Sequence, residues 1–308
     1  MKKKIGIFIF IVICSTVMLS DWIERIYIGR LAGLPGRYNS YVGIQKEQKD
    51  SIDMLVLGDS ESMTSISPME LWKSTGITSY ICGQSGQRIS ESYYMLKHAL
   101  DYQSPQVVLL ETNMLFRYTN TPDSLRSSIS DTAMYYFPVL QYHNIVNDQI
   151  PEGWQSYKGF AIRSGVAAYS KGSYMKKTKK EKEIPQINLW YLDKIRKLCE
   201  KNKIQLLLYT SASPVNHNYK RYNAVLKYAG KYGIPYIDFN QKLKELGIDW
   251  KNDTLDKGDH LNLSGAHKIT DYMTMYLQEH YMLPDHGGDE KFTSWDTMAS
   301  QYTTETGY

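Results

Sequence analysis

Short apolar runs alternate with helical patterns along most of this chain, and this alternation constrains the fold more than any other feature. Five runs suit strands, at 54–57, 77–82, 107–110, 204–209 and 234–239. The first, 54–57, is a continuous apolar stretch that ends in Gly58, which is typical of a parallel strand buried on both faces. Helical patterns lie between them, and another at 264–278 follows the last. We therefore predict an α/β fold, a doubly wound, flavodoxin-like parallel sheet of about five strands with helices on both faces.

The N-terminus carries a second strong pattern. Lys2 to Lys4 precede an apolar run from Ile5 to Leu19, and Trp22 and Ile23 extend it toward the about 20 residues that a membrane span needs. No small-x-small cleavage site follows, which favours an uncleaved membrane helix over a cleaved secretory signal. The positive-inside rule then keeps the lysines in the cytoplasm. We expect a single-pass cell-membrane protein with an extracytoplasmic domain, and secretion after signal cleavage is the alternative.

These patterns divide the chain into segments. Residues 1–23 form the anchor or signal-like segment, 24–52 a stalk, and 53–283 the α/β domain. An aromatic insertion at about 119–183 interrupts the domain. The tail at 284–308 is polar and rich in threonine, so we expect it to be loosely ordered.

Composition excludes some function classes. The net charge of +4 is too small to imply a nucleic-acid partner, and no arginine-rich run supports one. The three cysteines show no CxxC or Cys/His spacing of a metal site. We therefore expect no metal and no cofactor.

Two separated residues suit nucleophilic catalysis. Ser60 directly follows the first predicted strand, after Gly58 and Asp59, and His260 lies in a loop before the last predicted helix. Sites in parallel sheets form at the carboxyl ends of strands. A serine hydroxyl needs a base to take its proton, and histidine is the usual base at neutral pH. Ser60 is the predicted nucleophile and His260 the predicted base; a helix N-cap and a surface turn are the structural alternatives.

The supporting groups are less sharply defined. A carboxylate should fix the tautomer of His260, and both Asp256 and Asp259 are candidates. Asp256 is preferred, because a bulge at Gly258 could bring its carboxylate within reach of His260. Asp259 is directly adjacent to His260, and the side chains of adjacent residues on an extended loop diverge. Gly86 follows the second predicted strand and Asn113 the third. A backbone N–H at Gly86 and the Asn113 amide could stabilise an oxyanion together with the Ser60 N–H.

Four blocks in this order resemble the SGNH/GDSL hydrolase superfamily over about residues 53–283. They are Gly58-Asp59-Ser60, Ser85-Gly86-Gln87, Asn113 and His260-Leu261-Asn262. The resemblance implies catalytic roles for Ser60 and His260 and oxyanion roles for Gly86 and Asn113. The chain departs from the family pattern at two points. Asn113 lacks the usual flanking Gly and Asp, and Lys257 stands where the family has its aspartate. If neither Asp256 nor Asp259 reaches His260, the triad is a dyad.

A narrower resemblance concerns the insertion and the end of the domain. The segments 140–143, 157–160 and 259–266 are similar to a bacterial subgroup that works beside membrane-bound O-acyltransferases. Its broader relatives are the alginate acetylation proteins and the D-alanyl transfer protein of teichoic acids. The resemblance implies a membrane-bound O-acyltransferase as partner and an envelope glycan or teichoic acid as acceptor. Tyr142, Trp154 and Tyr157 of the insertion offer aromatic faces for sugar rings.

These observations predict an extracytoplasmic serine esterase or O-acyltransferase that acts on cell-envelope polymers. A Ser-His-Asp triad would form an acyl-enzyme, which a sugar hydroxyl or water would then resolve. The sequence leaves transfer and hydrolysis open. The alternative function is a catalytically silent glycan-binding or scaffold partner of the acyltransferase, which the unusual spacing before His260 favours.

Overall fold

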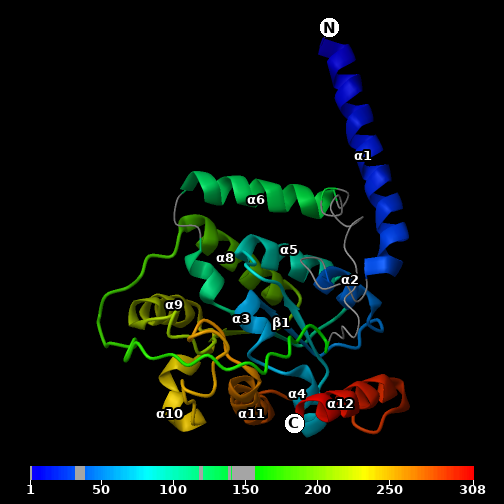
Figure 1. Cartoon of the computed structure of the whole chain (residues 1–308). Helices are drawn as coiled ribbons and strands as arrows, with labels where there is room; N and C mark the ends of the chain where they lie inside the picture. The colour runs from blue at the N-terminus through cyan, green and yellow to red at the C-terminus, as the bar shows by residue number, and fades with distance from the viewer. Residues whose placement is uncertain (1, 32–38, 118–120, 138–139, 141–156) are drawn as a thin grey trace.

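The computed structural model describes the chain except residues 1, 32–38, 118–120, 138–139 and 141–156 (Figure 1). A five-stranded sheet forms the centre, in the order β2-β1-β3-β4-β5. Its strands are β1 (Met54–Gly58), β2 (Ser79–Gly83), β3 (Val107–Glu111), β4 (Gln205–Thr210) and β5 (Tyr236–Asp238). Every neighbouring pair is parallel. This is the flavodoxin-like order, so the predicted fold class is confirmed.

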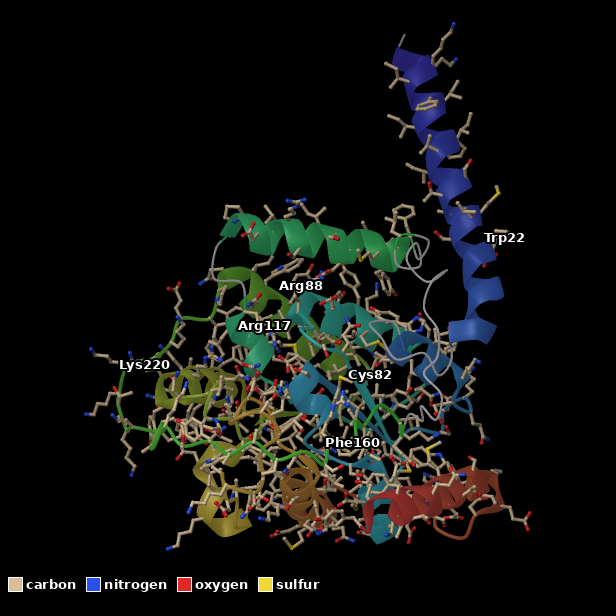
Figure 2. All side chains as sticks on the ribbon, viewed as in Figure 1. Trp22, Cys82, Arg88, Arg117, Phe160 and Lys220 are labelled. Atoms are coloured by element: carbon tan, nitrogen blue, oxygen red, sulfur yellow. The ribbon has the colours of Figure 1, made fainter. Side chains whose placement is uncertain are left out.

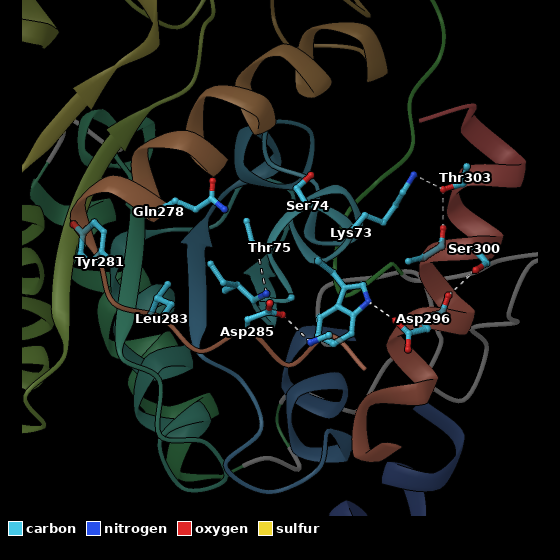
Figure 3. Close-up of a pocket in the computed structure, with 15 residues that line it drawn as sticks. Lys73, Ser74, Thr75, Gln278, Tyr281, Leu283, Asp285, Asp296, Ser300 and Thr303 are labelled. Atoms are coloured by element: carbon cyan, nitrogen blue, oxygen red, sulfur yellow. Dashed lines mark hydrogen bonds between the residues drawn. The ribbon is translucent and has the colours of Figure 1, made fainter. Parts of the chain in front are cut away.

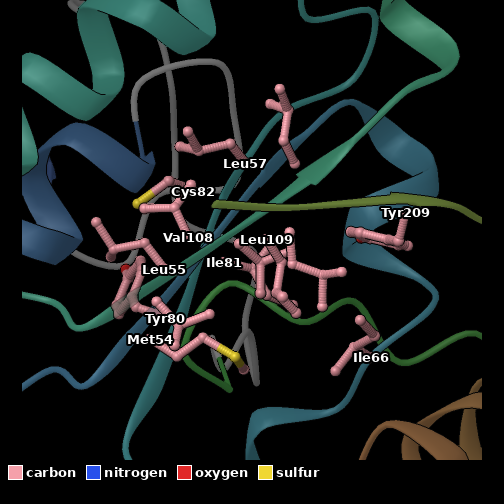
Figure 4. Close-up of a cluster of buried hydrophobic side chains, with 14 of the residues drawn as sticks. Met54, Leu55, Leu57, Ile66, Tyr80, Ile81, Cys82, Val108, Leu109 and Tyr209 are labelled. Atoms are coloured by element: carbon pink, nitrogen blue, oxygen red, sulfur yellow. The ribbon is translucent and has the colours of Figure 1, made fainter. Parts of the chain in front are cut away.

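Helices cover both faces of the sheet. α5 (Ile89–Ala99) and α8 (Gln186–Lys201) pack together on one face, and α4 (Pro68–Thr75) and α11 (Leu263–His280) on the other (Figure 1). The strand side chains between these layers are buried, and Leu55, Val108 and Leu109 are among them (Figure 4). The remaining helices of the domain are α3 (Ser60–Met63), α9 (Tyr219–Tyr232) and α10 (Leu243–Leu246). Short 3-10 helices occupy Asn113–Phe116, Phe239–Gln241 and Glu290–Phe292.

The N-terminal segment is helical beyond the predicted anchor. α1 spans Lys2–Leu31, and its part from Lys3 to Trp22 is long and apolar enough to cross a membrane. A signal sequence has the same properties. The predicted stalk is not wholly separate from the domain, because α2 (Asn39–Lys46) contacts β2. Val42 and Ile44 of α2 are buried there.

The prediction of a loosely ordered tail is wrong. Residues Thr293–Thr306 form α12, which packs against α4. Trp295, Ala299 and Tyr302 are buried, and their spacing puts them on one helical face. The hydroxyl of Tyr302 also donates a hydrogen bond to the buried carboxylate of Glu70. The threonines that suggested disorder lie mostly on the other faces of this helix.

The insertion contributes three described parts. The helix α6 (Thr121–Tyr136) contacts α5 and α8. Residues 157–160 lie along the edge of β2, where the Ile81 N–H donates to the Lys158 carbonyl at 2.9 Å. A side chain at Gly159 would come within 2.2 Å of the Ile81 carbonyl, so this close approach requires glycine. Residues 161–183, which we call the strap, then run without helix or strand toward α8.

Candidate active site

Ser60, His260 and Asp256 form a hydrogen-bonded line at the carboxyl edge of the sheet. Ser60 is the first residue of α3, directly after β1, and His260 lies on the loop before α11. The Ser60 Oγ and His260 Nε2 atoms lie 2.8 Å apart. On the other side of the ring, His260 Nδ1 lies 2.7 Å from Asp256 Oδ2. This geometry allows a proton to pass from the serine hydroxyl to the imidazole.

The loop conformation determines which aspartate meets the histidine. Lys257 and Gly258 both have positive φ, at 63° and 93°, and they turn the chain back on itself. The Asp256 carboxylate thereby also accepts a hydrogen bond from the His260 backbone N–H at 2.7 Å. The nearest oxygen of Asp259 is 3.8 Å from Nδ1, beyond hydrogen-bond distance. Asp256 is therefore the carboxylate that orients the imidazole.

The strap holds this loop from one side. Ala167 donates its N–H to the Thr254 carbonyl at 3.0 Å and accepts from the Lys257 N–H at 2.8 Å. Farther along, the Leu263 N–H donates to the Arg163 carbonyl at 2.7 Å. These backbone bonds flank His260 on both sides. The insertion thus supports the histidine loop, a role that its sequence did not indicate.

The loop after β4 holds the histidine loop from another side. The Ser213 hydroxyl is within 2.9 Å of both the Gly258 and Asp259 carbonyls. The Asn216 amide donates to the Glu61 carboxylate at 2.6 Å and to the Asp259 carboxylate. Asn216 therefore connects the residue after Ser60 with the residue before His260. Sequence reasoning missed both residues, and the position of their loop after a strand was the only signal for them.

The predicted oxyanion groups lie in two different environments. Gly86 has φ +66°, in the turn between β2 and α5. The side chain of Asn113 is buried, and its amide donates one hydrogen bond to Asp59 Oδ2 at 3.0 Å. Its carbonyl oxygen accepts from Arg221 at 3.0 Å. An amide group carries two hydrogens, so Asn113 retains a second N–H for a substrate oxygen.

Three buried carboxylates, those of Asp59, Glu61 and Glu111, cluster at the carboxyl ends of β1 and β3, and none of them was predicted as a site residue. Asp59 accepts from the Arg117 guanidinium at 2.6 Å, which compensates its charge. Burial raises the pKa of Glu61 well above its ordinary value, and the nearby Glu111 and Asp59 raise it further. Burial and Asp59 likewise raise the pKa of Glu111. Glu61 and Glu111 therefore keep protons to a higher pH than exposed carboxylates do.

Of the three aromatic residues predicted to bind sugar, only Tyr157 lies among the described residues. Tyr142 and Trp154 lie outside the described residues. The prediction for Tyr157 is wrong, because its side chain is only 2% exposed. Its hydroxyl donates to Glu305 at 2.6 Å, and its ring packs against Tyr302 of α12. Tyr157 therefore joins the insertion to the C-terminal helix.

Two groups of described residues have the composition and closeness of a metal site. One is Asp256, Asp259 and His260, and the other is Glu70, His267 and Asp271. In both groups the histidine Nδ1 is already within hydrogen-bond distance of a carboxylate, at 2.7 Å and 2.6 Å. These contacts account for the clustering without an ion.

A cavity of about 900 Å³ lies elsewhere (Figure 3). It opens between the end of α4, the segment after α11 and the outer side of α12. Ile77, in its lining, precedes β2, so the cavity lies toward the amino ends of the strands. Neither Ser60 nor His260 lines it. The cavity is therefore separate from the predicted catalytic residues.

Comparisons with known proteins give only distant similarity. No protein-family model and no curated protein matches the chain. Among solved structures, a proposed acylhydrolase of Bacteroides fragilis aligns with a TM-score of 0.38 and 14% identity, over 82% of this chain and 94% of that one. A GDSL-like lipase of Bacteroides thetaiotaomicron aligns with a TM-score of 0.39 and 11% identity, over 83% and 97%. Similarity this low identifies no function, so the function is inferred from the geometry of the site.

Proposed function

We propose that this chain is a serine esterase or O-acyltransferase of the SGNH/GDSL type. One observation carries the proposal: Ser60, His260 and Asp256 are hydrogen-bonded in series, with 2.8 Å and 2.7 Å between successive polar atoms. The series lies at the strand end where α/β folds place their sites. It has the order and spacing that an activated serine needs.

The proposed reaction proceeds through an acyl-enzyme. His260 Nε2 takes the Ser60 proton while Oγ attacks the carbonyl carbon of an acyl ester or thioester. Asp256 stabilises the resulting imidazolium at Nδ1. The N–H groups of Ser60 and Gly86 and the Asn113 amide stabilise the oxyanion. The tetrahedral intermediate then expels the alcohol or thiol, which takes the proton from His260. A second hydroxyl, or water, repeats these steps and releases the acyl group.

The cellular setting is also part of the proposal. The apolar helix α1 supports anchorage in the cell membrane, with the α/β domain on the extracytoplasmic side. The acceptor would be an envelope glycan or teichoic acid, and a membrane-bound O-acyltransferase would supply the acyl group. The acceptor and the partner rest on the sequence resemblance alone. Transfer, rather than hydrolysis, requires that an acceptor hydroxyl outcompete water at the acyl-enzyme.

A fluorophosphonate probe tests the serine directly. The full chain in detergent should be labelled at Ser60, and the Ser60→Ala variant should not be labelled. With an aryl acetate as donor and an oligosaccharide as acceptor, mass spectrometry distinguishes acylated sugar from free acetate. Absence of labelling together with absence of turnover would favour the scaffold alternative. The hydrogen bond between Asp256 and His260 weakens that alternative, because the unusual spacing before His260 was one of its two supports, beside the missing Gly and Asp around Asn113.

A further inference from the structure

The helix α6 is attached to the domain mainly through its polar side. Ser128 shares a hydrogen bond of 2.6 Å with Tyr191 of α8. Asp131 is buried and pairs with Arg88, the residue directly before α5. Thr132 shares a hydrogen bond with a tyrosine of α5 at 2.7 Å. A helix on the surface of a soluble domain ordinarily presents its apolar side to the core, so an attachment that relies on these polar groups is unusual.

The neighbouring stripe of α6, which includes Thr132, exposes large apolar side chains. Leu125 is 52% exposed, Ile129 62% and Tyr136 57%. Their spacing of four and seven residues puts them on one stripe of the helix. Contiguous exposed apolar surface of this kind is uncommon on soluble proteins and marks a contact with another apolar phase or surface.

Aromatic and basic residues flank this stripe. Trp190 on the neighbouring helix α8 is 50% exposed, and the Lys194 ammonium lies 3.9 Å from the centre of its ring. On α5, the Lys97 ammonium lies 4.7 Å from the centre of the Tyr135 ring. Tryptophan, tyrosine and lysine gather where proteins meet the headgroup region of a bilayer. The basic groups also complement anionic headgroups.

The candidate membrane helix leaves the domain on the same side. α1 rises from the domain past the level of α6, whereas α12 lies at the opposite end (Figure 1). Trp22, near the end of the apolar part of α1, lies on the α6 side, and Arg88 lies below α6 (Figure 2). A bilayer that contains α1 would therefore face the exposed stripe of α6.

From these observations we infer that the stripe of Leu125, Ile129 and Tyr136 rests in the surface of the lipid bilayer. Its apolar side chains lie at the boundary between headgroups and acyl chains, as in interfacial amphipathic helices. The inference rests on the proposed membrane anchorage and is independent of the proposed chemistry. Because Asp131 of α6 holds Arg88, two residues after Gly86, the active-site edge of the sheet would be held near the membrane. The enzyme would then act on acyl groups presented at the bilayer surface.

An environment-sensitive fluorophore at residue 129 tests the inference in the full chain. The variant carries Cys14→Ser and Ile129→Cys, is labelled with a nitrobenzoxadiazole thiol reagent, and is reconstituted in vesicles of phosphatidylcholine and phosphatidylglycerol. The native Cys82 and Cys199 are buried and do not react in the folded protein. The matched control carries the same probe at Ser300→Cys, an exposed position on α12. The wild-type chain labelled at Cys14 reports on α1 separately.

Bilayer contact predicts that lipids brominated in their acyl chains quench the probe at residue 129, and that aqueous iodide does not. The control at residue 300 should show the reverse. Adding Leu125→Glu and Tyr136→Glu should abolish the lipid quenching at residue 129. Equal iodide quenching at 129 and 300 would overturn the inference. Protection from iodide without lipid quenching would also overturn it and would indicate contact with a second copy of the chain. Lipid quenching at Cys14 shows whether the anchorage holds, whichever result residue 129 gives.

Discussion

Replacing Asp256 by asparagine should nearly abolish turnover, and the hydrogen bonds of this residue give the reason. Asp256 accepts from the His260 backbone N–H through one oxygen and faces His260 Nδ1 with the other. An asparagine there has one oxygen and one NH₂ group. Because the backbone N–H can only donate, the asparagine oxygen must stay opposite it. The NH₂ group must then face Nδ1, which puts the ring proton on Nε2 and leaves no base for Ser60.

The expected loss follows from two contributions. A hydrogen bond to a charged group contributes about 1.5–3 kcal/mol. Losing this stabilisation of the imidazolium, as Asp256→Ala does, should cost about 10- to 150-fold in kcat/KM. Asp256→Asn also enforces the wrong tautomer, and such replacements in serine triads cost about 10⁴-fold. The asparagine variant should therefore be less active than the alanine variant, although asparagine is closer than alanine to aspartate in shape.

Hydrolysis of an aryl acetate by the full-length variants measures both effects. Asp259→Asn is the matched control, because its carboxylate lies 3.8 Å from Nδ1 and the asparagine oxygen can still accept from Asn216. It should retain activity within about threefold of the wild type, since no bond to the imidazole is lost. A larger loss for Asp259→Asn than for Asp256→Asn would refute this assignment of the carboxylate.

Four further predictions concern the catalytic pair, the loops and the stability of the domain. Ser60→Ala and His260→Ala should each lower kcat by about 10⁴-fold or more, and the double variant should be no worse, as turnover assays would show. Asn216→Ala should lower kcat/KM about tenfold through the loss of its hydrogen bonds, while circular dichroism shows an intact fold. Burial raises the pKa of Glu111, so the folded protein keeps a proton that the unfolded chain releases above about pH 4.3, and stability falls as pH rises from there through the raised pKa. In urea unfolding between about pH 5 and 8, the free energy of unfolding of Glu111→Gln should decrease less with rising pH than that of the wild type. An equal decrease in both proteins would mean that other groups cause it. Trp295→Ala should lower the free energy of unfolding by about 3–5 kcal/mol in the same assay, and a negligible change would mean that α12 does not stabilise the domain.

The sheet could be predicted because its strands are short, mainly apolar runs between helical patterns. The runs at 54–57 and 107–110 match β1 and β3 almost residue for residue. The run at 234–239 is less accurate, since β5 keeps only Tyr236–Asp238 and Phe239 begins a 3-10 helix. The C-terminal helix escaped prediction because its buried residues, Trp295, Ala299 and Tyr302, are diluted among threonines. The threonines of this segment obscure the helical spacing of these three residues, which becomes evident only from their tertiary packing.

The two central residues of the site could be predicted, but the hydrogen bonds that hold them in place could not. A serine after a strand and a histidine before the last helix suffice to propose Ser60 and His260. The choice between Asp256 and Asp259 depends on the positive φ of Lys257 and Gly258, and only glycine of these two signals such a backbone. The link through Asn216 joins residues that are distant in sequence, and no local pattern encodes it.

The orientation of α6 shows the same limit and has a mechanical consequence. Periodicity places Leu125, Ile129 and Tyr136 on one side of a helix, but it does not say whether that side faces inward. The polar partners on α5 and α8 decide this, because a buried Asp131 without Arg88 would be an uncompensated charge. Arg88 also directly precedes α5 and lies two residues after Gly86. A force on α6 therefore reaches the predicted oxyanion loop through a buried ion pair, so contact of α6 with a membrane would bear on the geometry around Ser60.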